Sequence, residues 1–172
     1  MEFDLVRNGV KWNKEQEEMV TSLTDHACIM YQSPRRSGTT FAICGMIAHL
    51  MMCDEHANVV LFVTSTVSRQ KAAKWIVDFC ASERVVVSGT SLSTEHATVH
   101  LVLYSENPKF TEPVDVWVVD AADLQPLQVF FKYIVPSLQL HNPRVLLTHT
   151  EPMPSFEDID LFHCIRVSKL DM

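Results

Sequence analysis

Glycine is scarce in this sequence: the 172 residues include four glycines and eight prolines. Flexible glycine-rich loops are therefore few, and a glycine in a turn is a candidate for a conformationally demanding position. Basic residues are also in deficit, because 14 Lys and Arg stand against 21 Asp and Glu for a net charge of -7. This balance argues against a protein that binds nucleic acid over its whole surface, and it leaves only a local basic patch open.

The sequence also lacks the features of a secreted, metal-binding or membrane-spanning protein. Its five cysteines include no CxxC pair and its eight histidines show no ligand spacing, which argues against a disulfide framework or a zinc site. Cys28, Cys44 and Cys164 lie in apolar or alternating runs and are expected to be buried, reduced thiols. No signal peptide is apparent, and the longest apolar stretch, 41–53, is shorter than the ~20 residues that span a bilayer. We therefore expect a soluble, intracellular protein.

Apolar residues are plentiful enough for one folded domain over residues 1–172. Hydrophobic residues make up 47% of the chain and aromatic residues 9%, which excludes collagen-like, coiled-coil and disordered classes. The run 58–64 is continuously apolar and β-branched, as is typical of a strand covered on both faces. Strands are expected at 28–32, 58–64, 84–87, 97–104, 114–120, 144–149 and 161–167, a turn at 88–91, and helices at 13–23, 38–53, 68–80 and about 124–134. This alternation predicts an α/β fold with a mostly parallel central sheet.

The segment between the first expected strand and the second expected helix carries a partial phosphate-binding pattern. It reads Ser-Pro-Arg-Arg-Ser-Gly-Thr-Thr, and a strand, a tight turn and a helix are the context in which backbone N–H groups cradle phosphates. The P-loop pattern GxxxxGK[ST] matches at Gly38 and Thr40, whose hydroxyl can reach magnesium. The segment departs at the first glycine, where Ser33 stands, and at the lysine, where Thr39 stands. No ammonium therefore reaches the β- and γ-phosphates from that position.

Two later strands end in residues that suit the same kind of site. The run 114–120 is apolar and ends in Asp120, the form of a Walker B strand whose aspartate supports Mg²⁺. The next position, where a glutamate normally polarises the attacking water, is Ala121, and the nearest following carboxylate is Asp123. The following apolar run ends in small hydroxyl residues, among them Thr148, which can sense a γ-phosphate. The plain alternatives are a strand-end cap for Asp120 and an ordinary β-branched strand residue for Thr148.

Together these segments make the sequence resemble the ATPase domain of the terminase large subunit, the DNA-packaging motor of herpesviruses and tailed phages. The resemblance is carried by residues 33–40, 117–122 and 147–150, and its order and spacing run from about residue 11 to residue 150. It implies a single three-layer P-loop domain with ATP and Mg²⁺ as ligands, and without the family's C-terminal nuclease domain. It also implies that Gln16 contacts adenine, against the alternative of an ordinary surface glutamine.

The resemblance assigns roles to individual residues. Thr40 and Asp120 would hold Mg²⁺, and the nucleotide would be bound by Gln16, Ser33, Gly38, Thr39, Thr40 and Thr148. Arg35 and Arg36 join Asp120 as catalytic candidates, because some terminases carry the basic residue early in this loop. Two arginines at a helix N-terminus oppose the helix dipole, which favours a nearby anion; the alternative is a solvated turn.

The departures from the family pattern remove two side-chain groups that ATP hydrolysis uses. Phosphoryl transfer depends on electrostatic stabilisation and a positioned water, so Thr39 in place of lysine and Ala121 in place of glutamate are expected to slow it by many powers of ten. Whether the chain is an enzyme stays open here, with the balance against it.

Three functions follow from these residues. The leading hypothesis is a non-hydrolysing, terminase-like component with a structural or regulatory role in a viral DNA-packaging or assembly complex. It would bind nucleotide weakly or not at all, act through viral partner proteins, touch DNA only indirectly, make no membrane contact and be open to oligomerisation. As a viral protein it would work in the host nucleus or cytoplasm. The alternatives are an active packaging ATPase that uses Arg35 or Arg36, and a purely structural protein-interaction module; a helicase-like P-loop protein shares the expected fold.

Overall fold

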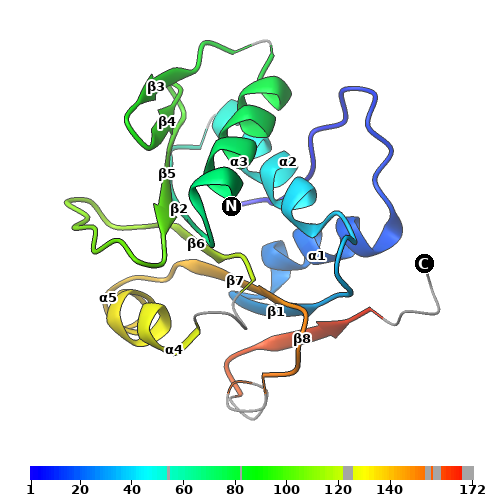
Figure 1. Cartoon of the computed structure of the whole chain (residues 1–172), viewed down its shortest axis with the longest axis vertical. Helices are drawn as coiled ribbons and strands as arrows, with labels where there is room; N and C mark the ends of the chain where they lie inside the picture. Colours follow the sequence, from blue (N-terminus) through cyan, green and yellow to red (C-terminus); the bar gives the residue numbers. More distant parts are fainter. Residues whose placement is uncertain (54, 82, 122–125, 154–155, 157–159, 168–172) are drawn as a thin grey trace.

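Strands and helices alternate along the chain in a computed structural model, which describes residues 1–53, 55–81, 83–121, 126–153, 156 and 160–167 (Figure 1). The strands are β1 (Cys28–Gln32), β2 (Ala57–Val63), β3 (Val86–Ser88), β4 (Ser91–Ser93), β5 (Ala97–Leu103), β6 (Val116–Val119), β7 (Arg144–His149) and β8 (His163–Arg166). The helices are α1 (Lys14–Asp25), α2 (Thr39–Met52), α3 (Thr66–Phe79), α4 (Pro126–Val129), the π-helical turn η2 (Phe130–Ile134) and α5 (Val135–Leu140).

The described strands form one sheet in the order β3-β4-β5-β2-β6-β7-β1-β8. Strands β5, β2, β6, β7, β1 and β8 run parallel, so their carboxyl ends share one edge of the sheet. Strands β3 and β4 add an antiparallel hairpin at the far side. The α/β class with a mostly parallel sheet is confirmed.

Helices cover both faces of the sheet, which gives three layers (Figure 1). One face packs against α1, α2 and α3 in a continuous apolar cluster. The other face packs against η2 and the segment before β8 in a second cluster. Every residue of β2 is buried, which explains why residues 59–63 are continuously apolar rather than alternating; Asn58, near the start of the strand, is buried and polar.

The N-terminal segment before α1 is part of the core, although its sequence predicts no regular element. Phe3 and Leu5 are buried there. The indole Nε1 of Trp12 donates to the carbonyl of Val6 at 2.7 Å, and its ring packs against Phe41 with centroids 5.3 Å apart. This aromatic contact fixes the segment against α2.

The expected turn at 88–91 is confirmed, whereas one strand was missed and one burial expectation is wrong. The turn is the tip of the β3–β4 hairpin, where Ser88 pairs with Ser91 and Gly89 has φ 60°. Strand β4, which follows the turn, was not expected. Such a short, polar strand as β4 gives no hydrophobic pattern to read. Cys164 is exposed, because β8 is an edge strand in which only Ile165 is buried. Cys28 and Cys44 are buried as expected, and burial raises the pKa of the Cys28 thiol to about 11.

The helical segment after β6 extends beyond the expected end at residue 134. Residues 124 and 125 of the expected helix lie outside the described residues. Helix α5 begins at Val135 with a proline in its first turn, where the missing N–H is tolerated, and η2 precedes it. Among the described helices, none is long and apolar enough to cross a membrane.

Gly45 of α2 tests the N-terminal packing. A Cβ at this position would lie 2.8 Å from Cζ2 and Cη2 of Trp12. Overpacking should therefore outweigh the gain in helix propensity, and Gly45→Ala should lower the free energy of unfolding by about 1 to 2 kcal/mol in urea denaturation. Lys74→Ala on the exposed face of α3 is the control, with a change within about 0.5 kcal/mol. A stabilised Gly45→Ala variant would show that Trp12 does not hold this position.

Candidate functional site

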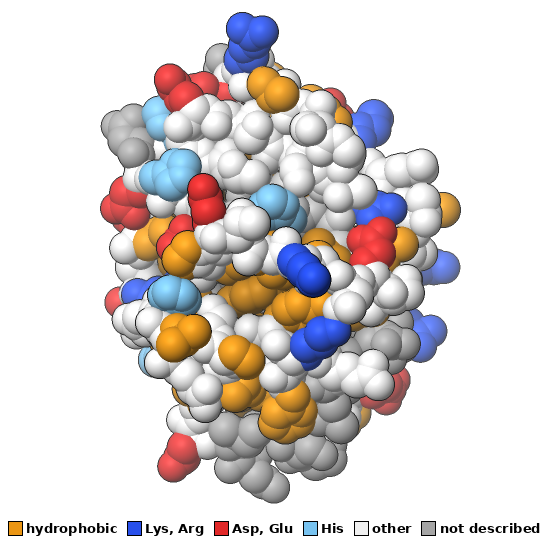
Figure 2. Space-filling model, turned by 90° about the vertical axis from the view of Figure 1, so that its left-hand side faces the viewer, with side chains coloured by type: hydrophobic (Ala, Val, Ile, Leu, Met, Phe, Trp, Pro, Cys, Tyr) orange, Lys and Arg blue, Asp and Glu red, His pale blue; other side chains and the backbone are white. Residues whose placement is uncertain are grey.

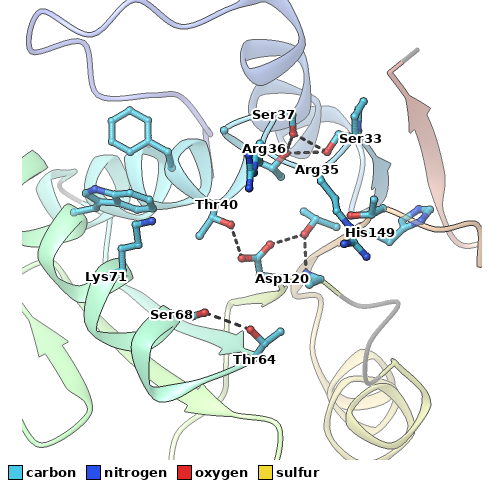
Figure 3. A pocket seen from close by; sticks show the side chains of 18 residues that line it. Ser33, Arg35, Arg36, Ser37, Thr40, Thr64, Ser68, Lys71, Asp120 and His149 are labelled. Atoms are coloured by element: carbon cyan, nitrogen blue, oxygen red, sulfur yellow. Dashed lines mark hydrogen bonds between the residues drawn. The ribbon is translucent and has the colours of Figure 1, made fainter. Parts of the chain in front are cut away.

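A cavity of about 410 Å³ lies where the carboxyl ends of β1, β6 and β7 meet the start of α2 (Figure 3). Parallel pairing places Tyr31 opposite Thr148 and Val119 opposite Leu147, so the residues that follow β1 and β6 flank the end of β7. The predicted site residues that line the cavity are Ser33, Arg35, Arg36, Gly38, Thr39, Thr40, Asp120 and Thr148. The fold therefore brings together three segments that are far apart in the sequence.

Two residues of the loop before α2 have left-handed backbone conformations. Arg36 has φ 61° and Gly38 has φ 78°, and Gly38 is the N-cap residue of α2. A left-handed residue next to a right-handed one can direct successive backbone N–H groups toward an anion, and the helix dipole adds positive potential at the start of a helix. A Cβ at position 38 would lie 2.7 Å from Nε2 of Gln16, so it would displace the end of that side chain from its contact with the loop.

Gln16 lies outside the cavity lining and supports the loop from α1. Its Nε2 donates to the carbonyl of Gly38 at 3.2 Å. Its Oε1 accepts from the backbone N–H of Asn13 at 3.0 Å, within the capping box that begins α1. The structure therefore shows Gln16 as a link between α1 and the loop, and its contact with adenine stays a prediction.

The two positions that depart from the P-loop pattern bond to each other. The hydroxyl of Ser33 lies 2.9 Å from that of Thr39, and the hydroxyl of Ser37 lies 3.0 Å from the first and 2.7 Å from the second. This hydroxyl cluster closes the loop with neutral side chains, where the family pattern has a glycine and a lysine. These contacts hold the loop together, and position 39 supplies no ammonium.

Asp120 is held by hydroxyl groups from two other elements (Figure 3). Thr40 of α2 donates to Oδ2 and Thr148 of β7 donates to Oδ1, each at 2.8 Å. The backbone of Asp120 is fixed as well, since its N–H donates to the carbonyl of Phe62 at 3.2 Å and its carbonyl accepts from the hydroxyl of Tyr104. The carboxylate therefore joins α2, β6 and β7 at the floor of the cavity.

The residue after Asp120 offers the cavity no acid or base. Ala121 has φ 55°, a left-handed conformation that costs a non-glycine residue about 1 kcal/mol or more, and its N–H donates to Oγ1 of Thr148 at 3.2 Å. Its methyl group stands among the lining residues. Asp123, the nearest following carboxylate in the sequence, lies outside the described residues.

The cavity has a local excess of positive charge. Arg35, Arg36 and Lys71 line it, and Asp120 is the one carboxylate among its described lining residues. None of the three cations forms an ion pair with an acidic group in the described part of the chain. Elsewhere the surface mixes both signs, as on the face in Figure 2, where hydrophobic side chains are exposed between scattered charges. In a chain of net charge -7, this concentration of cations favours an anionic ligand.

Sequence reasoning missed the side of the cavity that α3 supplies. Thr64, Ser68, Lys71 and Trp75 all line it, and the hydroxyls of Thr64 and Ser68 lie 3.3 Å apart. The helical spacing of α3 is readable from the sequence. That this helix faces the loop before α2 depends on the order of strands in the sheet, for which the sequence carries no local signal.

The donor set at the floor of the cavity fits Mg²⁺. Oγ1 of Thr40 and Oδ2 of Asp120 are hard oxygen ligands, the kind that this ion prefers, and they lie 2.8 Å apart. Adjacent ligands of an octahedral Mg²⁺ with bonds of about 2.1 Å lie about 3.0 Å apart, so both oxygens can reach one ion with a small adjustment.

Comparison with known proteins finds structural neighbours for this fold. No family model matches the sequence, and no curated protein matches it. The large terminase ATPase domain of Thermus phage P74-26 is similar in structure, with a TM-score of 0.75 at 10% identity over 95% of this chain and 83% of that one. The large terminase of a thermophilic bacteriophage, solved in complex with ADP, has a TM-score of 0.64 at 12% identity, over 93% of this chain and 48% of that one. A DEAD box protein from Methanococcus jannaschii has a TM-score of 0.65 at 12% identity, over 96% of this chain and 57% of that one.

These likenesses show that the chain has the fold of a terminase ATPase domain, which is also the core of the DEAD box protein. The chain spans 36% to 48% of the longer phage terminase chains that resemble it. The expected P-loop type of fold is thereby confirmed, and the roles of the individual site residues stay predictions.

The contact between Thr148 and Asp120 should contribute measurably to stability. Thr148 is 3% exposed, and Thr148→Val removes the donor to Oδ1 and the acceptor for the N–H of Ala121. We expect the free energy of unfolding to fall by about 1 to 3 kcal/mol in chemical denaturation. Thr64→Val is the matched control, because its exposed hydroxyl contacts the hydroxyl of Ser68 at the surface, and it should change stability by no more than about 0.5 kcal/mol. Equal losses in the two variants would contradict this account.

Proposed function

We propose that this chain binds a magnesium–nucleoside triphosphate in the cavity beside α2 and does not hydrolyse it efficiently. The observation that carries the proposal is the pairing of Thr40 with Asp120 at 2.8 Å, next to an Ala121 that offers no carboxylate. Binding and hydrolysis need different groups. The groups for binding are present, and the position that would activate water carries a methyl group.

The binding step would use the loop, the helix dipole and the local cations. Backbone N–H groups at the start of α2 would bind phosphate oxygens, with Arg36 and Gly38 in the left-handed conformations that direct them. Thr40 and Asp120 would hold Mg²⁺, which neutralises charge on the phosphates when bound. Arg35 and Arg36 line the same cavity without an acidic partner among the described residues, so they are available to a phosphate.

The hydrolytic step lacks two contributions. A positioned general base accelerates a reaction by about 10² to 10⁴-fold, and Ala121 has no side-chain group to act as one. Thr39 adds no charge, because its side chain is a neutral hydroxyl. That hydroxyl is engaged with Ser33 and Ser37 in the loop. Electrostatic stabilisation of the transition state is weaker as a result.

The fold supports a place for this chain in a viral packaging or assembly complex. The P74-26 domain with the same fold belongs to a large terminase, and the large terminase of a thermophilic bacteriophage has been solved with ADP. A domain that binds nucleotide and retains it can act as a structural or regulatory partner of viral proteins. Its interaction with them would then depend on whether nucleotide is bound. Contact with DNA would then pass through a partner, because the chain is acidic overall.

Binding and turnover measured on one preparation test the proposal. With Mg²⁺ present, calorimetric titration should show saturable ATP binding, and release of inorganic phosphate should stay at the level of a no-protein control. Asp120→Ala should weaken ATP binding in Mg²⁺ by about tenfold or more, because it removes a charged metal ligand. Turnover by the wild-type chain that Asp120→Ala abolishes, and that Arg35→Ala or Arg36→Ala lowers, would instead establish an active ATPase with a deviant loop.

Introducing the two residues of the family pattern should give the chain ATP hydrolysis. The double variant Thr39→Lys/Ala121→Glu supplies an ammonium at the loop and a carboxylate at the cavity wall, and both positions already line the cavity. We expect phosphate release to rise at least about 100-fold above the level of the no-protein control, at which the wild-type chain is expected to stay. Adding Asp120→Ala to the double variant is the control and should remove the gain. No gain in a double variant that is folded and binds ATP would mean that more than these two groups is missing.

A further inference from the structure

The cavity holds a lysine that the P-loop pattern does not predict. Lys71 of α3 is the one lysine among the described residues that line the cavity. Thr39, at the position where the pattern has its lysine, lines the same cavity. Figure 3 shows Lys71 on one side of Thr40 and Asp120 and Arg35 on the other. The described lining therefore carries cations on two sides of its magnesium-fitting pair.

The strand order explains how α3 reaches this position. Strand β2 lies beside β6 in the sheet, and α3 begins three residues after β2 ends at Val63. Asp120 directly follows β6, so Lys71 approaches the cavity from the side of Asp120 and away from β1. The hydroxyls of Thr64 and Ser68 lie on the same side.

Packing positions the Lys71 ammonium without neutralising it. Its Nζ lies 4.9 Å from the centre of the Trp75 ring, a cation–π distance. Trp75 in turn packs edge-on against Phe41 of α2 with ring centroids 5.2 Å apart, and Phe41 follows Thr40 directly. The ammonium is thus tied to the helix that carries Thr40, and no described acidic group forms an ion pair with it.

We propose that Lys71 supplies, from α3, the phosphate contact that Thr39 cannot supply from the loop, and that it contacts the terminal phosphate of the nucleotide. This inference rests on the proposed function. The loop N–H groups would bind the inner phosphates, and Thr40 and Asp120 would hold Mg²⁺, which would supply positive charge to the phosphates when bound. A cation beyond that pair, on the side away from the loop, then meets the γ-phosphate. The consequence is a preference for a triphosphate over a diphosphate.

The test compares ATP and ADP affinities, each with Mg²⁺, by calorimetric titration of four chains. Lys71→Ala should weaken ATP binding by about tenfold and ADP binding by less than about twofold, because only ATP carries the γ-phosphate. Lys71→Arg keeps the charge and should keep most of the preference for ATP. Lys74→Ala removes a lysine three residues along the same helix that does not line the cavity, and it should leave both affinities at the wild-type level.

The outcomes separate this inference from the function on which it rests. Wild-type affinity for ATP in Lys71→Ala, or equal losses for ATP and ADP, would overturn the role of Lys71 and leave the proposed function standing. The same loss of ATP affinity in Lys74→Ala would also overturn it, because the effect would then come from the general charge of α3. Absence of binding of either nucleotide to the wild-type chain would overturn the proposed function and this inference together. Equal melting temperatures of the four chains without nucleotide establish that the variants are folded.

Discussion

The hydrogen bonds that Asp120 accepts from Thr40 and Thr148 are the interaction on which the rest of the site depends. Each is 2.8 Å long, and together they join the start of α2 to the ends of β6 and β7. The parallel sheet makes them available, because its strands end at one edge and deliver side chains from distant segments to one point. The same two hydroxyls that steady the carboxylate also define where a metal ion and a phosphate would be received.

Under the proposed function, binding and turnover depend on different groups around this centre. The loop geometry, the helix N-terminus, the Thr40–Asp120 pair and the cations that line the cavity all favour an anionic ligand in an otherwise acidic molecule. The hydroxyl cluster of Ser33, Ser37 and Thr39 preserves the loop without charge, and Ala121 places a methyl group where a base would stand. Such an arrangement suits a protein that acts by holding a bound nucleotide and not by hydrolysing it.

The sequence predicts those parts of the fold and of the candidate site that local residue patterns determine. Strands buried on both faces carry apolar runs, such as residues 59–63 of β2 and 145–147 of β7, so both strands were predictable. Gly38 and Asp120 lie at helix and strand ends that motifs define. The remainder depends on packing between distant segments. The burial of Phe3 follows from a tertiary contact of a segment with no periodic pattern. The position of Lys71 follows from the place of β2 beside β6, and the exposure of Cys164 follows from β8 being an edge strand.

A crystal structure of the chain with a non-hydrolysable ATP analogue and Mg²⁺ tests the central claim most directly. The account predicts a triphosphate against the backbone of residues 33–40, with the ion bound between Thr40 and Asp120 in place of their 2.8 Å hydrogen bond. It also predicts no side-chain carboxylate from position 121 at the γ-phosphate. A saturated crystal in which Thr40 and Asp120 keep their direct contact and the cavity beside them holds no nucleotide would contradict it.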